Sequence, residues 1–191
     1  MHIADGILPN VWCGAAHGVA WAAVYGLGRK VETHEIVRMG LLASAAFVIS
    51  LVHFPLGGTS VHLGLYGLIG ILLSFRAFPV IFAALLFQTL LFQHGGLLSL
   101  GLNAVNMGSG ALLASLIWRS PWKADVPKAF VCGFVGILVP ALLLATEFAM
   151  VGYGRGFYFI AMLYLGVAAL EGALTAVVVS FLRRTKPTVF A

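Results

Sequence analysis

The chain has 191 residues, of which 61% are hydrophobic and 9% are charged, and its formal net charge is +5. Soluble globular domains carry about 25% charged residues, so these numbers exclude a soluble catalytic domain and predict an all-α membrane protein. They also argue against disorder and nucleic-acid binding, because the positive net charge reflects a shortage of acidic residues beside the Lys and Arg that flank membrane helices.

The hydrophobic runs predict about seven transmembrane helices in one domain that spans residues 1–191. A polar segment over residues 1–9 comes first. In chain order, the helices are expected near 10–28, 39–56, 62–75, 77–93, 102–118, 128–151 and 157–182. Crossing the bilayer takes about 20 residues, so the run at 62–75 is short for a complete span. We expect its outer end to be buried in protein rather than exposed to lipid.

The distribution of basic residues predicts the orientation in the membrane. Ten of the eleven Lys and Arg residues fall in alternate connections or in the tail, and Arg155 alone lies on the other side. The ten are Arg29, Lys30, Arg38, Arg76, Arg119, Lys123, Lys128, Arg183, Arg184 and Lys186. The positive-inside rule then places the N-terminus outside and the C-terminus in the cytoplasm of a multi-pass protein of the inner (plasma) membrane. We keep Met1 as the mature N-terminus, because the basic n-region typical of a signal peptide is missing.

The outer face predicted in this way carries three polar segments, at residues 1–6, 57–62 and 93–96, the last followed by Asn103 and Asn106. The segments contain histidine, which is the commonest metal ligand in proteins. Few formal charges accompany them. The sequence therefore predicts a binding site at this face.

The first two residues form the most specific pattern. A free amine on Met1 followed by His2 offers three nitrogens in one plane: the α-amine, the deprotonated His2 amide and the imidazole Nδ1. They close a five-membered and a six-membered chelate ring, which suits metals with square-planar nitrogen coordination, above all Ni(II) and Cu(II), with Co(II) as a further choice. We expect a fourth nitrogen from His62, at the outer end of a helix after Gly57-Gly58. Either histidine alone is more typical of a packed or helix-end residue; their position on the same side favours a shared metal.

Three separated motifs carry a resemblance to a known family. They are MHIxDG at residues 1–6, PxGGTSxH at 55–62, and LFQHGG at 91–96 followed by GxNxxNM at 101–107. They resemble the signature segments of the CbiM/NikM family, the substrate-binding membrane subunits (S components) of energy-coupling factor (ECF) transporters for cobalt and nickel. The resemblance implies a seven-helix S component whose metal ligands are the amine of Met1, the amide and imidazole nitrogens of His2, and His62.

The resemblance also implies the substrate and partners. Ni²⁺ or Co²⁺ would be the transported substrate, with no catalytic cofactor, and cobalt would connect the system to cobalamin biosynthesis. The partners would be the ECF transmembrane (T) subunit, the ATPase subunits, a small auxiliary subunit on a separate chain where the system uses one, and the lipid bilayer. This chain contains no Walker-type GxxxxGK[ST] sequence, so ATP hydrolysis would be performed by partners. The sequence leaves the choice between nickel and cobalt open.

Other polar residues are expected to orient the loops around the metal. They are Asp5, Ser60, Gln93, His94, Asn103 and Asn106, with capping of a turn by Asp5 and direct ligation by His94 as alternatives. His17 and His53 are expected in helices as hydrogen-bonded packing residues. Glu147 and Glu171 are intramembrane carboxylates without an assigned partner, which makes them functional candidates.

Small residues recur every four positions in the first predicted helix, at Gly14, Gly18, Ala22 and Gly26. Such a stripe lets another helix approach closely. Two interpretations stay open: packing inside this chain, or docking against the transmembrane subunit of a transporter.

Two other classes of function agree less well with the sequence. A stand-alone channel or secondary carrier for a metal or small solute is the alternative, but it would place ionisable residues along several helices. An intramembrane enzyme lacks support, since the sequence contains no HExxH, GxSxG or paired-carboxylate motif. We therefore predict a transport subunit and not an enzyme.

Overall fold

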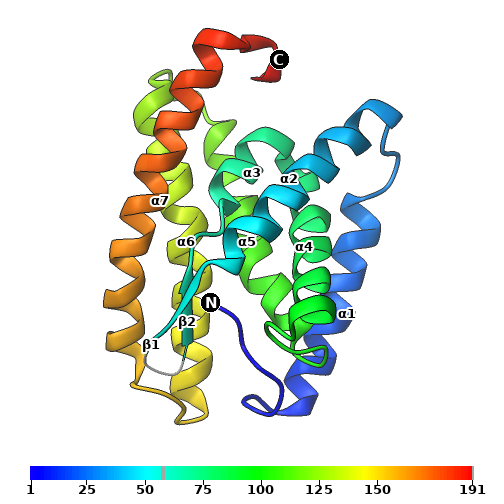
Figure 1. The fold of residues 1–191 in the computed structure, drawn as a ribbon, viewed down its shortest axis with the longest axis vertical. Coiled ribbons are helices and arrows are strands. Elements are labelled where there is room, and N and C mark those ends of the chain that lie inside the picture. Colours follow the sequence, from blue (N-terminus) through cyan, green and yellow to red (C-terminus); the bar gives the residue numbers. More distant parts are fainter. Residues whose placement is uncertain (57–58, 191) are drawn as a thin grey trace.

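The computed structural model describes residues 1–56 and 59–190, and only the backbone of residues 56, 59 and 60. Within them the chain forms seven α-helices, two 3-10 helices and one antiparallel hairpin (Figure 1). In chain order these are α1 (Asn10–Leu27), α2 (Thr33–Leu51), β1 (His53–Leu56), β2 (Thr59–His62), α3 (Tyr66–Leu73), η1 (Ser74–Arg76), α4 (Ala77–Phe92), α5 (Leu100–Trp118), α6 (Asp125–Met150), α7 (Phe157–Thr185) and η2 (Pro187–Phe190). The turn expected at Gly57-Gly58 lies outside the described residues.

Five stretches in the described part of the chain are long and apolar enough to cross a membrane. They are α2, the stretch Tyr66–Phe92 that contains α3, η1 and α4, and the helices α5, α6 and α7. Large hydrophobic side chains cover their outward faces, with Leu41 69% exposed and Tyr158 83% exposed. Apolar surface on this scale suits contact with lipid rather than water. The chain is therefore a helical, multi-pass membrane protein, and its seven spans and outward N-terminus stay predictions.

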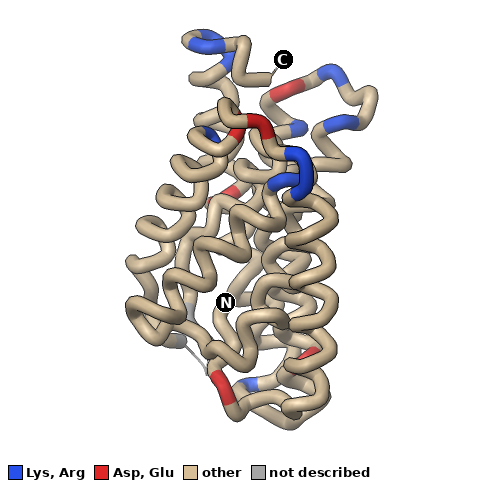
Figure 2. Tube along the Cα trace, turned by 90° about the vertical axis from the view of Figure 1, so that its right-hand side faces the viewer, with Lys and Arg blue, Asp and Glu red and all other residues tan. Residues whose placement is uncertain are grey.

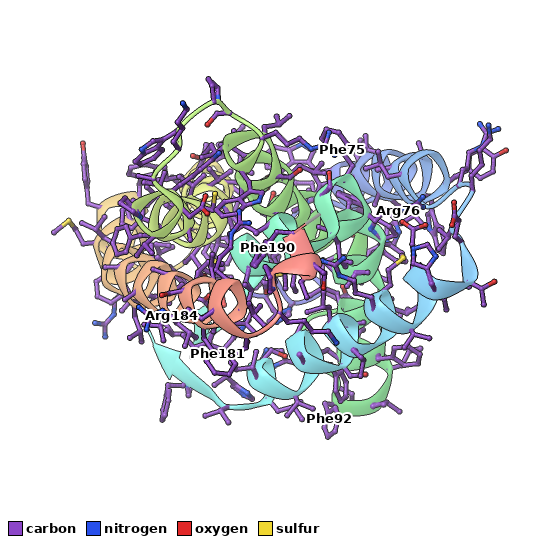
Figure 3. All side chains as sticks on the ribbon, turned by 90° about the horizontal axis from the view of Figure 1, so that it is seen from above. Phe75, Arg76, Phe92, Phe181, Arg184 and Phe190 are labelled. Atoms are coloured by element: carbon purple, nitrogen blue, oxygen red, sulfur yellow. The ribbon has the colours of Figure 1, made fainter. Side chains whose placement is uncertain are left out.

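The two ends of the bundle differ in charge. Most of the Lys and Arg gather at the end where the C-terminus lies (Figure 2). There η2 folds back over the bundle, and Figure 3 places Phe190 over the middle of that end. Arg38 Nη2 donates to the Val189 carbonyl at 2.8 Å, and the Arg183 guanidinium lies 4.5 Å from the centroid of the Phe190 ring. The tail is therefore attached to the ends of α2 and α7.

The short helix α3 lies at the centre because glycines bring three helices into backbone contact. A Cβ on Gly67 would lie 2.2 Å from the Cys132 carbonyl oxygen of α6, and one on Gly70 would lie 2.2 Å from the Ala111 carbonyl oxygen of α5. Small residues allow this approach of membrane helices. The expectation of a short run buried in protein is confirmed, since α3 has 8 residues and seven of them are buried.

The prediction of helix is wrong over residues 53–56 and at residue 62. Residues 53–56 form β1 and residues 59–62 form β2, and His53 lies directly opposite His62. Pro55 accounts for the difference, because proline disfavours helix at the preceding residue and cannot donate its own backbone hydrogen bond. The helix expected to reach residue 56 therefore ends at Leu51, and His62 ends a strand rather than beginning a helix.

The start of α2 also differs from the prediction. We expected this helix from residue 39, and it begins at Thr33. Glu32 and Glu35 form a capping box there, in which the Glu32 backbone N–H donates to the Glu35 carboxylate at 2.9 Å. A capping box satisfies the free N–H groups of the first helical turn. The helix therefore includes the charged residues Glu35 and Arg38, which we expected to lie before it. The remaining predicted helices, apart from the run at 62–75, lie within three residues of the observed ends.

The stripe of small residues on α1 does not pack inside this chain. A Cβ on Gly14, Gly18 or Gly26 would meet no atom of the described residues within 4 Å, and Ala22 is exposed. The interpretation as internal packing is therefore wrong. The stripe lies on the outer surface of the bundle, and docking against another subunit stays a prediction.

Candidate metal centre

The N-terminal segment enters the bundle beside β2, well away from the C-terminal end (Figure 1). Met1 is 2% exposed and Ile3 is fully buried. Two hydrogen bonds attach the Ile3 backbone to the Asn103 side chain of α5: Ile3 N donates to Oδ1 at 2.9 Å, and Nδ2 donates to the Ile3 carbonyl at 3.0 Å. The Ser99 hydroxyl donates to the same carbonyl at 2.7 Å. These three bonds fix the depth at which the first two residues lie.

Asp5 holds the same segment from the outside. Its carboxylate accepts hydrogen bonds from the backbone N–H groups of Leu98 and Ser99, at 3.2 and 2.8 Å, at the start of α5. Partial burial raises the pKa of Asp5, but the hydrogen bonds from Ser99 and Leu98 outweigh it and lower the pKa below its usual value. A carboxylate at a helix N-terminus is stabilised by the free N–H groups. Of the two roles expected for Asp5, capping is the one that these contacts support.

Glycines in the loop after α4 leave room for the segment. A Cβ on Gly96 would lie 1.9 Å from Asp5 Oδ1 and 2.7 Å from the Asp5 nitrogen. A Cβ on Gly95 would lie 3.4 Å from His2 Nδ1, and the φ of Gly95 is +85°, a conformation that other residues rarely adopt. The pair of glycines therefore lets the loop approach His2 and Asp5 more closely than other residues would.

The hairpin and α7 together position His62. Its Nδ1 lies 2.9 Å from the Leu63 carbonyl, so Nδ1 carries the proton and Nε2 keeps its lone pair. The next two residues are attached to α7, because Glu171 accepts hydrogen bonds from the backbone N–H groups of Gly64 and Leu65. The sequence alone identifies no partner for Glu171, because Gly64 and Glu171 lie 107 positions apart and local spacing does not link them.

Three imidazoles from three separate segments meet at this point. The ring centroid of His2 lies 4.8 Å from that of His62 and 4.1 Å from that of His94. One ring nitrogen from each of the three lies within 4.8 Å of the other two. Nε2 of each is buried and has no hydrogen-bond partner among the described residues. Unpaired buried nitrogens cost free energy, so the point where the three rings meet is a candidate site for a cation.

The buried nitrogens favour their neutral, metal-binding forms. Burial lowers the pKa of the Met1 α-amine to about 4. Burial, together with the neighbouring charges of His62 and the amine, lowers the pKa of His2 well below its usual value. Burial, followed by the neighbouring charge of the amine, lowers the pKa of His62 well below its usual value, and burial lowers that of His94 to about 4. Nitrogens that are already unprotonated can bind a metal without first losing a proton.

The donor set is nitrogen-rich. Among the described side chains, the group placed to hold a metal consists of histidines alone, and the nearby Asp5 carboxylate is occupied by α5. Imidazole suits transition metals such as Ni, Cu, Zn and Fe, whereas Mg²⁺ and Ca²⁺ prefer carboxylate oxygens. The arrangement therefore fits a transition-metal ion.

Other predicted residues lie elsewhere. Gln93 is exposed at the end of α4. Asn106 donates to the Glu147 carboxylate at 2.8 Å and does not contact the N-terminal segment in the described hydrogen bonds. The side chain of Ser60 lies outside the described residues. His17, expected as a packing residue of a helix, lies in α1 with Nε2 2.9 Å from the Leu97 carbonyl.

His53 is the residue that sequence reasoning misplaced. It was expected in a helix, but it lies in β1, with its ring centroid 4.4 Å from that of His94. Recognising the strand around Pro55 would have placed His53 opposite His62.

Comparisons with known proteins show which family the chain resembles. The profile of the CbiM family, described as "Cobalt uptake substrate-specific transmembrane region", matches residues 2–189. The chain is 30% identical to the cobalt transport protein CbiM of Sorangium cellulosum, over 99% of this chain and 94% of that one. It is 28% identical to the fused nickel transport protein NikMN of Rhodobacter capsulatus, over 100% of this chain and 64% of the longer protein. A crystal structure of a transition metal transporter superposes with a TM-score of 0.85, at 26% identity, over 96% of this chain and 93% of that one.

Proposed function

The chain belongs to the CbiM family, and from this premise we propose that it is the substrate-capture subunit of an ATP-driven ECF-type uptake transporter for nickel or cobalt. The metal binds at the outer face, through nitrogens of the N-terminal segment and the hairpin. The resemblance inferred from the three motifs is confirmed by the family match. The proposal goes further, to the ligands, the energy source and the direction of transport.

The observation that carries the proposal is the meeting of nitrogens around a buried N-terminus. Met1 is 2% exposed, His2 8% and His62 3%, although all three come from chain segments outside the long helices. An imidazole is ordinarily hydrated, and burying its nitrogens without a hydrogen bond is costly. A cation held between His2 and His62, with the Met1 amine as a further ligand, accounts for the folding of the first residues into the bundle.

We assign four ligand nitrogens. Met1 contributes the α-amine, and His2 contributes its backbone amide and Nδ1 in the planar chelate described above. Nε2 of His62 completes the plane, and the Nδ1 contact with Leu63 keeps Nε2 free for the metal. Hydrogen bonding of the opposite ring nitrogen is the usual way in which proteins orient a metal-binding imidazole. His94 lies beside His2 without belonging to the plane.

The charge distribution supports the direction of transport. The basic end of the bundle (Figure 2) would face the cytoplasm under the positive-inside rule, so residues 1–6 and the hairpin would open to the outside. Since this chain lacks a nucleotide-binding motif, energy would come from ATPase subunits through a transmembrane partner. The small-residue stripe exposed on α1 is available for such a partner.

The stand-alone carrier gains less support from the structure. The intramembrane carboxylates Glu147 and Glu171 are engaged, with Asn106 and with the backbone of Gly64 and Leu65. They therefore fix structure rather than line a path in the described part of the chain.

Metal titration of the purified protein tests the ligand assignment. With Ni²⁺ or Co²⁺, His62→Ala is expected to weaken binding by at least a hundredfold, because it removes one of four ligand nitrogens. The matched control is His34→Ala, a histidine whose side chain is 78% exposed and paired with Glu32. Equal affinity of the His62→Ala variant and the wild type would overturn the proposal.

A second experiment changes only the terminus. Acetylation of Met1, or one residue added before it, is expected to abolish high-affinity binding and uptake, since the amine is blocked or moved and His2 loses its position in the chelate. A tag after Ala191 is the control and is expected to be tolerated. One-to-one metal binding by the extended protein, with unchanged affinity and continued dependence on His62, would show that the amine is not a ligand.

A further inference from the structure

His53 lies at the entrance to the histidine cluster. It is exposed in β1, directly opposite His62 in the hairpin. Directly opposite residues of an antiparallel pair present their side chains on the same face, with Cβ atoms about 5 Å apart. Nδ1 of His53 lies 3.0 Å from the Leu51 carbonyl, so this nitrogen carries the proton. Its Nε2 lone pair is therefore free to bind a cation.

His94 joins this exposed imidazole to the buried ones. Its ring centroid lies 4.4 Å from that of His53 and 4.1 Å from that of His2. Exposure falls along the series, from the exposed His53 through the half-buried His94 to His2 at 8% and His62 at 3%. Nε2 of His94 has no hydrogen-bond partner among the described residues. The rings thus form a continuous row of nitrogen donors from the surface to the site.

We propose that His53 and His94 form a second, outer metal site, which takes up a hydrated Ni²⁺ or Co²⁺ ion and passes it to the site of Met1, His2 and His62. This inference rests on the proposed function, because it assumes that the inner site binds the metal. No redox step is involved: each transfer exchanges a water or imidazole ligand for the next imidazole. The only proton lost is that of the His2 amide, when the chelate forms.

The spacing of the rings suits this role. Metal–nitrogen bonds of about 2.0 to 2.1 Å place two imidazole nitrogens on one cation within about 4 Å of each other. Rings with centroids 4.4 Å apart and planes at 44° can meet that requirement with small rotations. Two neutral ligands without the chelate form a weaker site than the inner one, so the transfer runs inward.

A site on the entry path changes rates and leaves the equilibrium alone. Removal of His53 slows both entry and exit through the same intermediate, so the ratio of the two rate constants stays constant. A residue that stabilised only the inner site would instead raise the dissociation rate and the Kd. The two rate constants therefore separate an entry role from a structural one.

Stopped-flow mixing of the full-length protein with Ni²⁺ measures both constants. We expect His53→Ala to lower the association and dissociation rates each by about tenfold, with a Kd unchanged within a factor of two. His53→Asp, which keeps a metal ligand at this position, is expected to restore part of the rate. His34→Ala is the control and should match the wild type. Unchanged rates in His53→Ala, or a raised Kd with an unchanged association rate, would overturn the proposal.

The outer site can also be measured with the inner site disabled. In a His62→Ala protein acetylated on Met1, we expect weak binding of Cu²⁺, and the affinity should fall at least tenfold when His53→Ala is added. The electron paramagnetic resonance spectrum of the bound Cu²⁺ should show nitrogen hyperfine splitting, which His53→Ala should diminish. Residual binding independent of His53 would contradict the outer site. If His62→Ala and acetylation do not weaken wild-type binding, the proposed function itself fails; if they do and only the His53 effects are missing, this inference alone fails.

Discussion

The hydrogen bonds between Asn103 and Ile3 are expected to control whether the N-terminus stays in the bundle. Both groups are buried, with Asn103 2% exposed and Ile3 fully buried. Asn103→Ala removes the acceptor of the Ile3 N–H and the donor to its carbonyl. The carbonyl keeps the Ser99 hydroxyl at 2.7 Å, whereas the N–H loses its partner. The perturbation therefore acts mainly through one buried, unsatisfied donor.

The size of the effect follows from these two bonds. A buried donor left without an acceptor costs about 1 to 3 kcal/mol, and a lost hydrogen bond contributes about 0.5 to 1.5 kcal/mol. Together they destabilise the docked segment by about 1.5 to 4.5 kcal/mol. Since about 1.4 kcal/mol corresponds to a factor of ten, the undocked population of Asn103→Ala is expected to rise by at least about tenfold and by up to about a thousandfold.

Acylation of the Met1 α-amine reports on that population. A buried amine reacts only when the segment undocks, so the labelling rate, followed by mass spectrometry of the N-terminal peptide, should rise by the same factor. Asn106→Ala is the matched control, because Asn106 lies one turn further along α5 and contacts Glu147 instead. An unchanged rate in Asn103→Ala, or an equal rise in both variants, would refute the reasoning.

Three further predictions concern packing, the hairpin and protons. Gly96→Ala is expected to weaken Ni²⁺ binding at least tenfold in a titration, because its Cβ would overlap the N-terminal segment. The control is Gly166→Ala, whose Cβ would have no atom of the described residues within 4 Å and which should bind Ni²⁺ normally. Equal affinities of the two variants would contradict this steric account. Glu171→Ala is expected to lower both the melting temperature and the metal affinity. Glu171→Gln should keep most of both, because its amide oxygen can still accept hydrogen bonds from the backbone N–H groups of Gly64 and Leu65. Equal loss in both variants would assign the effect to the charge of Glu171. Protons favour the undocked segment, because the amine pKa is about 4 when docked and 8.0 when free, so docking loses about 1.4 kcal/mol for each pH unit below 8 down to about 4. Ni²⁺ affinity should therefore fall at least tenfold from pH 7 to pH 5.5, and a flat profile would rule out buried neutral nitrogens as ligands.

The long helices could be predicted from the sequence because their apolar runs have the length of a bilayer crossing. Short apolar segments were harder to assign, since a buried strand and a helix have the same composition over six to eight residues. Residues 53–56 continued the apolar run of α2 and were assigned to it, although Pro55 argued for an extended backbone. The position of His53 depended on that one distinction.

The sequence was enough to single out candidate ligand residues, but not the contacts that hold them in place. Met1, His2 and His62 stood out by ligand chemistry, and their place in short polar segments at one end of the bundle made a meeting plausible. The contacts of Asn103 with Ile3 and of Glu171 with Gly64 join residues about a hundred positions apart. Such pairs depend on how the helices pack, which neither periodicity nor local spacing specifies.

The absence of secondary structure in residues 1–9 has a consequence for the metal site. A helix or strand would carry its own backbone hydrogen bonds, whereas this segment depends on α5 and the loop before it for those described here. Two of the proposed ligand residues, Met1 and His2, belong to it, so undocking removes three of the four nitrogens at once. The apparent affinity is then the intrinsic affinity multiplied by the docked fraction. Under the proposed ligand assignment, the hydrogen bonds to Ser99 and Asn103 therefore control both capture and release. Substitutions there, at positions that do not touch the metal, are expected to change how tightly it is held.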